Sequence, residues 1–308
     1  MREFTLDIYE LMLKSFDLQG YGFSTFEEYV LNHKNKVIIL KHDVDKLPEN
    51  ALRMANLEKR LGIKTSYYFR TIDQLYDENI IKQIADMGHE VGYHYEDLDL
   101  SSRGQRSEVR GREKIEVGGR RSEVRRARAR VVGWMTDDGH QKELDYDALL
   151  DKSIKSFERN LSILREVVSV KTICMHGSPL SRYDNQKIWE KYDYRDYGII
   201  ADCYLDVDFD EVFYITDTGR SWNNSNASIR DKVNSKFDIT IKDTNHLIEK
   251  IQNNDFPDKI MINVHPQRWN DEFVPWVSEL VRQGVKNVIK RWVIRREEFR
   301  SQNPGARR

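Results

Sequence analysis

The chain has 308 residues, and its 39% hydrophobic and 11% aromatic content is enough for the core of one large domain or two smaller ones. Lys and Arg number 50 against 51 Asp and Glu, and the resulting net charge of −1 excludes nucleic-acid binding through the charge of the whole protein. The sequence has no apolar run near the ~18 residues of a membrane span, so we expect no membrane partner.

The N-terminal segment lacks the pattern of a signal peptide. Its opening stretch carries Glu3, Asp7 and Glu10, where a signal peptide needs a basic start and an uninterrupted apolar run. We therefore expect a cytoplasmic protein. The two cysteines, Cys174 and Cys203, are too few for a disulfide framework and are predicted to be core thiols.

The next part of the chain predicts alternating strands and helices. Short apolar runs that end in polar residues are typical of buried parallel strands, and apolar residues spaced by three and four indicate helices. Glycines mark the predicted helix ends. The predicted elements are a strand at Val37–Leu40, a helix from Pro48 to Gly62, a strand at Lys64–Phe69, a helix at Asn79–Met87 and a strand at Glu90–His94.

The second half continues this pattern. A long helix begins at Leu150, and its apolar stripe comprises Ile154, Phe157, Leu161, Leu164 and Val168. Further buried strands are predicted at Thr172–Met175 and Lys259–Val264. Repeated strand–helix units imply a parallel sheet, open or closed as a barrel. Because we find no dividing linker, we favour one α/β domain over residues 1–308.

The segment Ser101–Gly139 differs in composition from the rest of the chain. It repeats Arg-Ser-Glu-Val-Arg at Arg106–Arg110 and Arg121–Arg125. Ten Arg and one Lys against four Glu in residues 101–130 give a local charge of about +7. We predict a mobile surface insertion. A nucleic-acid-binding arm is the alternative, which we disfavour because aromatic residues are absent before Trp134.

Polar residues collect where the predicted strands end. In parallel α/β folds these carboxyl ends share one face, on which reactive groups gather. Four of the eight histidines fall at such positions or next to them. A single histidine there is usually a loop residue, and an Asp-x-Asp pair often caps a helix. Together, these residues favour a divalent metal such as zinc. The residues concerned are His42, Asp43, Asp45, Arg70, His94, Glu96, Asp97, His176 and His265.

Four short motifs in this order resemble those of the polysaccharide deacetylase family. The resemblance covers Val37–Leu100 and Leu144–Trp269, on either side of the Arg-rich segment. It implies an incomplete, distorted (β/α) barrel with a parallel strand core. It also implies a metal-dependent carbohydrate esterase that removes N- or O-acetyl groups, although some relatives cleave other non-peptide C–N bonds. The motifs are Leu40–Asp45, Gly88–His94, Met175–Pro179 and Asn263–Pro266.

The resemblance assigns roles to the acidic pair and to the last histidine. Asp43 matches the catalytic base and Asp45 a metal ligand, with Val44 separating the pair. Strand residues two apart face the same side, so both carboxylates are expected in one site. His265 matches the histidine that protonates the leaving group.

The metal ligands depart from the family pattern at one position. His94 matches the first of two metal histidines, but Leu98 stands where the second is found. The third ligand is therefore either Asp97 or His176, and of these we favour His176. If neither serves, the metal site is weakened or absent.

The substrate side is predicted from aromatic and cationic residues. Arg220 and Trp222 lie in the polar stretch Tyr214–Trp222, and Trp269 follows His265. Aromatic faces suit sugar rings, so we assign these three residues and Arg70 to substrate binding. A plain loop with a buried tryptophan is the alternative.

The combined reading is a metal-dependent hydrolase that removes an acetyl group from a small or oligomeric sugar, with zinc the favoured metal. Asp43 takes the proton of the attacking water and His265 protonates the departing amine or alcohol. The alternatives are a metal-free carbohydrate-binding pseudoenzyme, a hydrolase of another non-peptide C–N bond, and nucleic-acid binding by the insertion.

Overall fold

A curved parallel sheet forms the centre of the molecule in the computed structural model, which describes residues 2–32, 34–72, 76–103, 139–177, 183–222 and 233–302. The strands are β1 (Gly22–Ser24), β2 (Val37–Val44), β3 (Ser66–Phe69), β4 (Glu90–Tyr95), β5 (Thr172–Met175), β6 (Ala201–Asp202), β7 (Phe213–Thr216) and β8 (Lys259–Val264). Their order is β6-β5-β4-β3-β2-β8-β7, with β1 also on β2, and every pairing is parallel.

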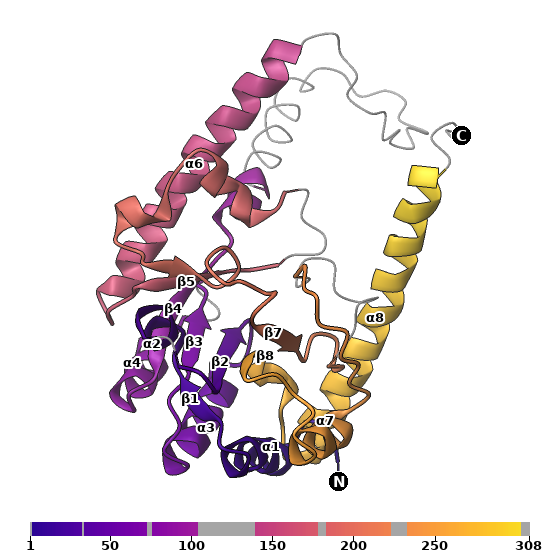
Figure 1. Ribbon diagram of the computed structural model, residues 1–308. Helices are drawn as coiled ribbons and strands as arrows, with labels where there is room; N and C mark the ends of the chain where they lie inside the picture. The colour runs from indigo at the N-terminus through magenta and orange to yellow at the C-terminus, as the bar shows by residue number, and fades with distance from the viewer. Residues whose placement is uncertain are drawn as a thin grey trace.

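Helices surround this sheet, which curls into a half-barrel (Figure 1). The prediction of an incomplete, distorted (β/α) barrel is confirmed. The α-helices are α1 (Leu6–Leu18), α2 (Phe26–Leu31), α3 (Pro48–Arg60), α4 (Glu78–Asp86), α6 (Gly139–Arg165), α7 (Thr244–Gln252) and α8 (Phe273–Gln302). The short 3-10 helices are η1 (Asn185–Glu190), η2 (Tyr194–Tyr197) and η3 (Pro266–Arg268).

The predicted helix stops have a conformational basis. Gly62 follows α3 with a φ of +73°, and Gly88 follows α4 with a φ of +89°. Side chains with a Cβ avoid this left-handed region, whereas glycine adopts it readily. Each glycine ends its helix and turns the chain into the next strand.

The interior of the half-barrel is filled by apolar and aromatic side chains. Gly92 on β4 makes room for the ring of Tyr68, because a Cβ there would overlap that ring and lie 2.9 Å from the Thr172 carbonyl oxygen. Cys174 and Cys203 belong to this interior cluster as buried free thiols. The packed interior closes the barrel beneath its carboxyl-end face.

The Arg-rich segment is bounded by helical residues. Residues 101–103 are helical and Arg103 pairs with Asp99, while α6 begins at Gly139. Both flanks of the predicted insertion are therefore helical where the structure describes them. The repeats themselves lie in residues 104–138, outside the described residues.

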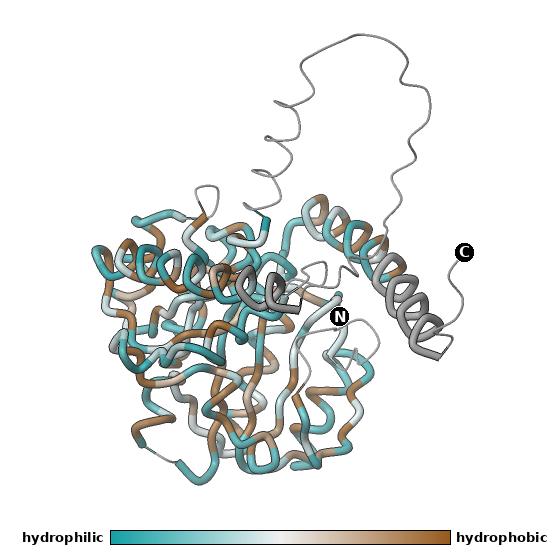
Figure 2. The backbone as a smooth tube through the Cα atoms, turned by 90° about the horizontal axis from the view of Figure 1, so that it is seen from above, coloured by the Kyte–Doolittle hydropathy of each residue, from teal (hydrophilic) through white to brown (hydrophobic). Residues whose placement is uncertain are grey.

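Hydrophilic and hydrophobic residues alternate along the helices that surround the sheet (Figure 2). Among the residues described, we find no helix that is both long and apolar enough to cross a membrane.

Candidate metal and catalytic site

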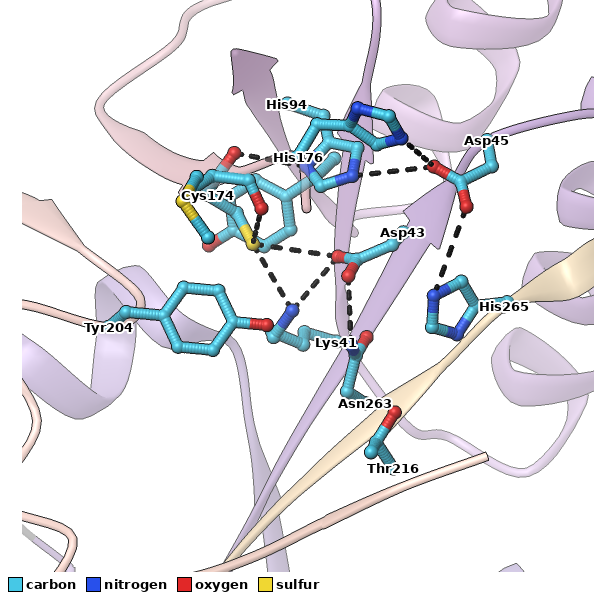
Figure 3. A network of polar contacts seen from close by, with 12 residues as sticks. Lys41, Asp43, Asp45, His94, Cys174, His176, Tyr204, Thr216, Asn263 and His265 are labelled. Carbon is cyan, nitrogen blue, oxygen red and sulfur yellow. Dashed lines mark hydrogen bonds and ion pairs between the residues drawn. The ribbon is translucent and has the colours of Figure 1, made fainter. Parts of the chain in front are cut away.

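Side chains from four neighbouring strand ends meet at the carboxyl-end face of the sheet (Figure 3). Asp43 lies within β2 and Asp45 directly follows it. His94 comes from β4, His176 follows β5 and His265 follows β8. All five are strand-end residues predicted from the sequence, and the parallel pairing brings them together.

Asp45, His94 and His176 form one group of possible metal ligands. The Nε2 atoms of His94 and His176 lie 3.5 and 3.4 Å from Asp45 Oδ1. The three ligand atoms lie within 4.8 Å of one another. Asp45 Oδ1 is buried and accepts no hydrogen bond among the described residues. Two imidazoles and a carboxylate that converge in this way fit a divalent ion such as zinc.

The orientation of His94 is compatible with metal binding. Its Nδ1 lies 3.0 Å from the carbonyl oxygen of Cys174. Because a carbonyl only accepts hydrogen bonds, Nδ1 carries a proton, which leaves Nε2 as the ring nitrogen that faces Asp45. His94 is 2% exposed, so the surrounding core holds the ring in place.

The imidazole of His176 lies against a carboxylate that is itself held by an arginine. Its Nδ1 lies 3.3 Å from Oε2 of Glu96, and Arg70 Nε donates to Oε1 of Glu96 at 2.7 Å. Burial alone would raise the pKa of Glu96, but His176 and Arg70 hold it below its ordinary value. The guanidinium of Arg70, which was predicted to bind substrate, pairs with Glu96 beside His176.

Asp97 faces away from this group. Its carboxylate accepts hydrogen bonds from Ser156 and Asn160 of α6 and from Tyr93. Burial raises the pKa of Asp97 to about 6. Of the two candidates for third ligand, the structure brings His176 to Asp45, whereas Asp97 is used in packing the long helix against β4.

Both oxygens of Asp43 accept hydrogen bonds from buried donors. Lys41 Nζ donates to Oδ1 at 2.9 Å and Asn263 Nδ2 donates to Oδ2 at 2.8 Å. Burial would raise the pKa of Asp43, but Lys41 and the histidines nearby hold it well below its ordinary value. Asp43 is therefore ionised, with a fixed carboxylate plane, beside the candidate metal ligands.

His265 is held by Asp217, which sequence reasoning missed. Nδ1 of His265 lies 2.7 Å from Oδ1 of Asp217, and its backbone N–H donates to Oδ2 at 3.0 Å. Arg268 also pairs with this carboxylate. Burial would raise the pKa of Asp217, but Arg268 and His265 lower it, so the carboxylate is ionised and faces Nδ1 as an acceptor. Nη1 of Arg268 lies 2.9 Å from the same Nδ1. His265 Nε2 then faces the site, 3.9 Å from Asp45 Oδ2.

The predicted sugar-binding aromatics are core residues. Trp222 is 1% exposed and donates from Nε1 to Thr244, and Trp269 is 2% exposed and donates from Nε1 to Asp217. The guanidinium of Arg220 lies over the rings of Phe4 and Trp276. The assignment of Trp222, Trp269 and Arg220 to substrate contact is therefore wrong, because protein atoms already cover their apolar faces.

A cavity of about 300 Å³ lies next to the residues that follow β6. Tyr204, Phe209, Asp208 and Gln186 are among its lining residues. The ring of Tyr204 also lies 5.2 Å from Lys41 Nζ, so Tyr204 both lines the cavity and contacts the surroundings of Lys41 (Figure 3). Aromatic and polar lining of this kind suits a polar ligand with an apolar ring face.

Comparison with known proteins gives structural neighbours only. We found no matching protein-family model and no matching curated protein. The chain is similar to a CE4 family pseudoenzyme from Bacillus anthracis, with 11% identity and a TM-score of 0.38 over 82% of this chain and 62% of that chain. The chain thus spans less than two thirds of that protein.

Two further solved structures are similar at the same level. A mutant of the pseudoenzyme with restored enzymatic activity has 10% identity and a TM-score of 0.36, over 84% of this chain and 64% of that chain. The Xyl-CE4 domain of a multidomain xylanase from the hindgut metagenome of Trinervitermes trinervoides has 13% identity and a TM-score of 0.35, over 82% and 84%. These neighbours carry the CE4 designation of the polysaccharide deacetylases that the sequence motifs resemble. At such identities and TM-scores the likeness carries no argument about activity, which is argued from the geometry of the site.

Proposed function

We propose that the protein is a metal-dependent hydrolase that removes an acetyl group from an N- or O-acetylated sugar. The observation that carries the proposal is the convergence of Asp45, His94 and His176 beside an ionised Asp43 and a His265 oriented by Asp217. A divalent ion held by the first three residues, with zinc favoured by the donor set, would supply Lewis acidity towards the acyl carbonyl oxygen and towards water.

Asp43 has the position and charge of a general base. Lys41 and Asn263 keep its carboxylate ionised and in one orientation, next to the ligands of the ion. An ionised carboxylate there accepts the proton that the attacking water loses.

His265 is placed to donate a proton to the departing nitrogen or oxygen. Asp217 fixes the proton on Nδ1 and stabilises the imidazolium, which holds the transferable proton on Nε2. Asp43 and His265 come from adjacent strands, β2 and β8, so the base and the acid approach the same carbonyl from neighbouring positions.

A carbohydrate-binding protein without catalytic metal is the second candidate. It is favoured by Leu98, which stands where the family motif has its second metal histidine and which is fully buried here. Hydrolysis of another non-peptide C–N bond would use the same residues on a different substrate.

Acetate release tests the proposal. The purified protein is stripped with a chelator, reloaded with zinc or cobalt, and incubated with N-acetylglucosamine oligomers and with O-acetylated oligosaccharides. We expect acetate release that disappears on stripping and returns on reloading. A protein that binds these sugars but releases no acetate from any of them with the ion bound would favour the binding protein and contradict the hydrolase.

A further inference from the structure

A second group of possible metal ligands lies directly beneath the first. Ligand atoms of Asp43, His94 and Cys174 also lie within 4.8 Å of one another, and all three residues are buried. Carboxylate, imidazole and thiolate are zinc ligands in proteins. His94 belongs to both groups, so an ion that it binds has two alternative sets of partners. The choice matters because Asp43 serves as a base in one case and as a ligand in the other.

The ammonium group of Lys41 lies within this second group (Figure 3). Its Nζ is 2.9 Å from Asp43 Oδ1 and 3.2 Å from Cys174 Sγ. Lys41 is 0% exposed, and the rings of Tyr204 and Tyr68 lie 5.2 and 5.8 Å from Nζ. The ammonium is therefore fully enclosed by protein atoms.

The positive charge of the Lys41 ammonium makes binding of a metal cation in the same group unfavourable. Two cations at such separations repel strongly where water is excluded, and Asp43 Oδ1 is already engaged with Lys41. In the first group, the atoms nearest to Asp45 Oδ1 are the imidazole nitrogens of His94 and His176, which are themselves metal ligands, and Lys41 does not pair with Asp45 among the described residues.

We propose that Lys41 excludes a metal ion from the Asp43–His94–Cys174 group and thereby directs it to Asp45, His94 and His176. The inference rests on the metal site of the proposed function, and it assigns Lys41 as the residue that keeps Asp43 available as a base. It also explains why a buried lysine stands two residues before Asp43 on β2.

Cobalt substitution tests this role without measuring activity. Cobalt(II) bound to a cysteine thiolate gives a charge-transfer absorption in the near ultraviolet, which imidazole and carboxylate ligands do not give. The wild-type protein loaded with cobalt is expected to lack this band. Lys41→Met removes the charge and keeps a similar shape, so the band is expected to appear. It should vanish again in Lys41→Met/Cys174→Ser and persist in Lys41→Met/Cys203→Ser, the matched control on the other buried thiol.

Each outcome is decisive. A thiolate band in the wild-type protein would overturn the inference, and this measurement needs no variant to fold. A folded, cobalt-loaded Lys41→Met or Lys41→Gln protein without the band would also overturn it, whereas Lys41→Arg, which keeps the charge, should lack the band. Equilibrium dialysis of the wild-type protein distinguishes failure of this inference from failure of the proposed function. If the protein bound no cobalt at all, the proposed function itself would be contradicted.

Discussion

Replacing Asp217 by asparagine removes the charge that orients His265 and leaves the shape of the side chain. The carboxylate accepts from His265 Nδ1 and Arg268 at one oxygen, and from the His265 N–H and Trp269 Nε1 at the other. In Asp217→Asn the amide NH2 replaces one oxygen, so two buried donors lose their acceptor. At roughly 1–3 kcal/mol for each such donor, the free energy of unfolding falls by roughly 2–6 kcal/mol.

The catalytic effect of Asp217→Asn follows from the tautomer of His265. Without the carboxylate, Nδ1 no longer holds its proton and the imidazolium loses its stabilising charge, so turnover should fall by about 10²–10⁴-fold. The assay combines acetate release, metal content and urea unfolding, with Asp196→Asn as the control on an exposed carboxylate. Wild-type turnover in a folded, metal-loaded Asp217→Asn protein would refute this reasoning.

Four further results are expected. Glu96→Gln should weaken zinc affinity about 10–100-fold, measured by competition with a chelator, because Glu96 orients His176. Asp43→Asn should retain the metal and lose about 10²–10⁴-fold in kcat, with a lower Tm because the amide faces two donors. The pKa of Asp97 in the folded protein is raised from 3.8 to about 6. Its protonated form therefore stabilises the fold at acid pH, and this contribution to the free energy of unfolding, up to about 3 kcal/mol, is lost as pH rises through that interval. The stability deficit of Asp97→Ala should therefore be larger at about pH 4.5 than at about pH 7.5, and an equal deficit at both would contradict the shift. Gly92→Ala should lower Tm by several degrees in thermal unfolding, and an unchanged Tm would show that the Tyr68 ring yields easily.

The central strands were predictable because they are buried on both faces. The strands β2, β3, β4, β5 and β8 were each predicted near their observed positions, since such strands appear as continuous apolar runs. Their order then brings Asp45, His94 and His176 together, which the argument from strand ends anticipated.

Asp217 was missed because its strand was missed. The strand β7 lies at the end of the strand order and leads directly into the polar stretch that contains Asp217, so its four residues do not stand out as a continuous buried run as those of β3 and β5 do. Without β7, the sequence predicts a substrate-binding stretch at Tyr214–Trp222, with a plain loop as the alternative, and gives Asp217 no role. The same alternation that places Asp43 and Asp45 on one side also places Lys41 there, a signal that was present in the sequence but not used.

The exposure of Trp222 and Trp269 could not be predicted from the sequence. Residue type identifies Trp222 and Trp269 as large amphipathic groups, but their exposure depends on what packs against them. Here Phe4, near the N-terminus, contacts both rings, and such long-range contacts leave no local pattern.

Metal analysis of His176→Ala beside Asp97→Ala tests the central claim most directly. His176 belongs to the Met175–Pro179 motif and Asp97 follows the Gly88–His94 motif, but only His176 approaches Asp45. The account predicts one divalent ion per chain in the wild-type protein and in folded Asp97→Ala, and loss of that ion in His176→Ala. A full complement of metal in His176→Ala would contradict the proposed ligand set.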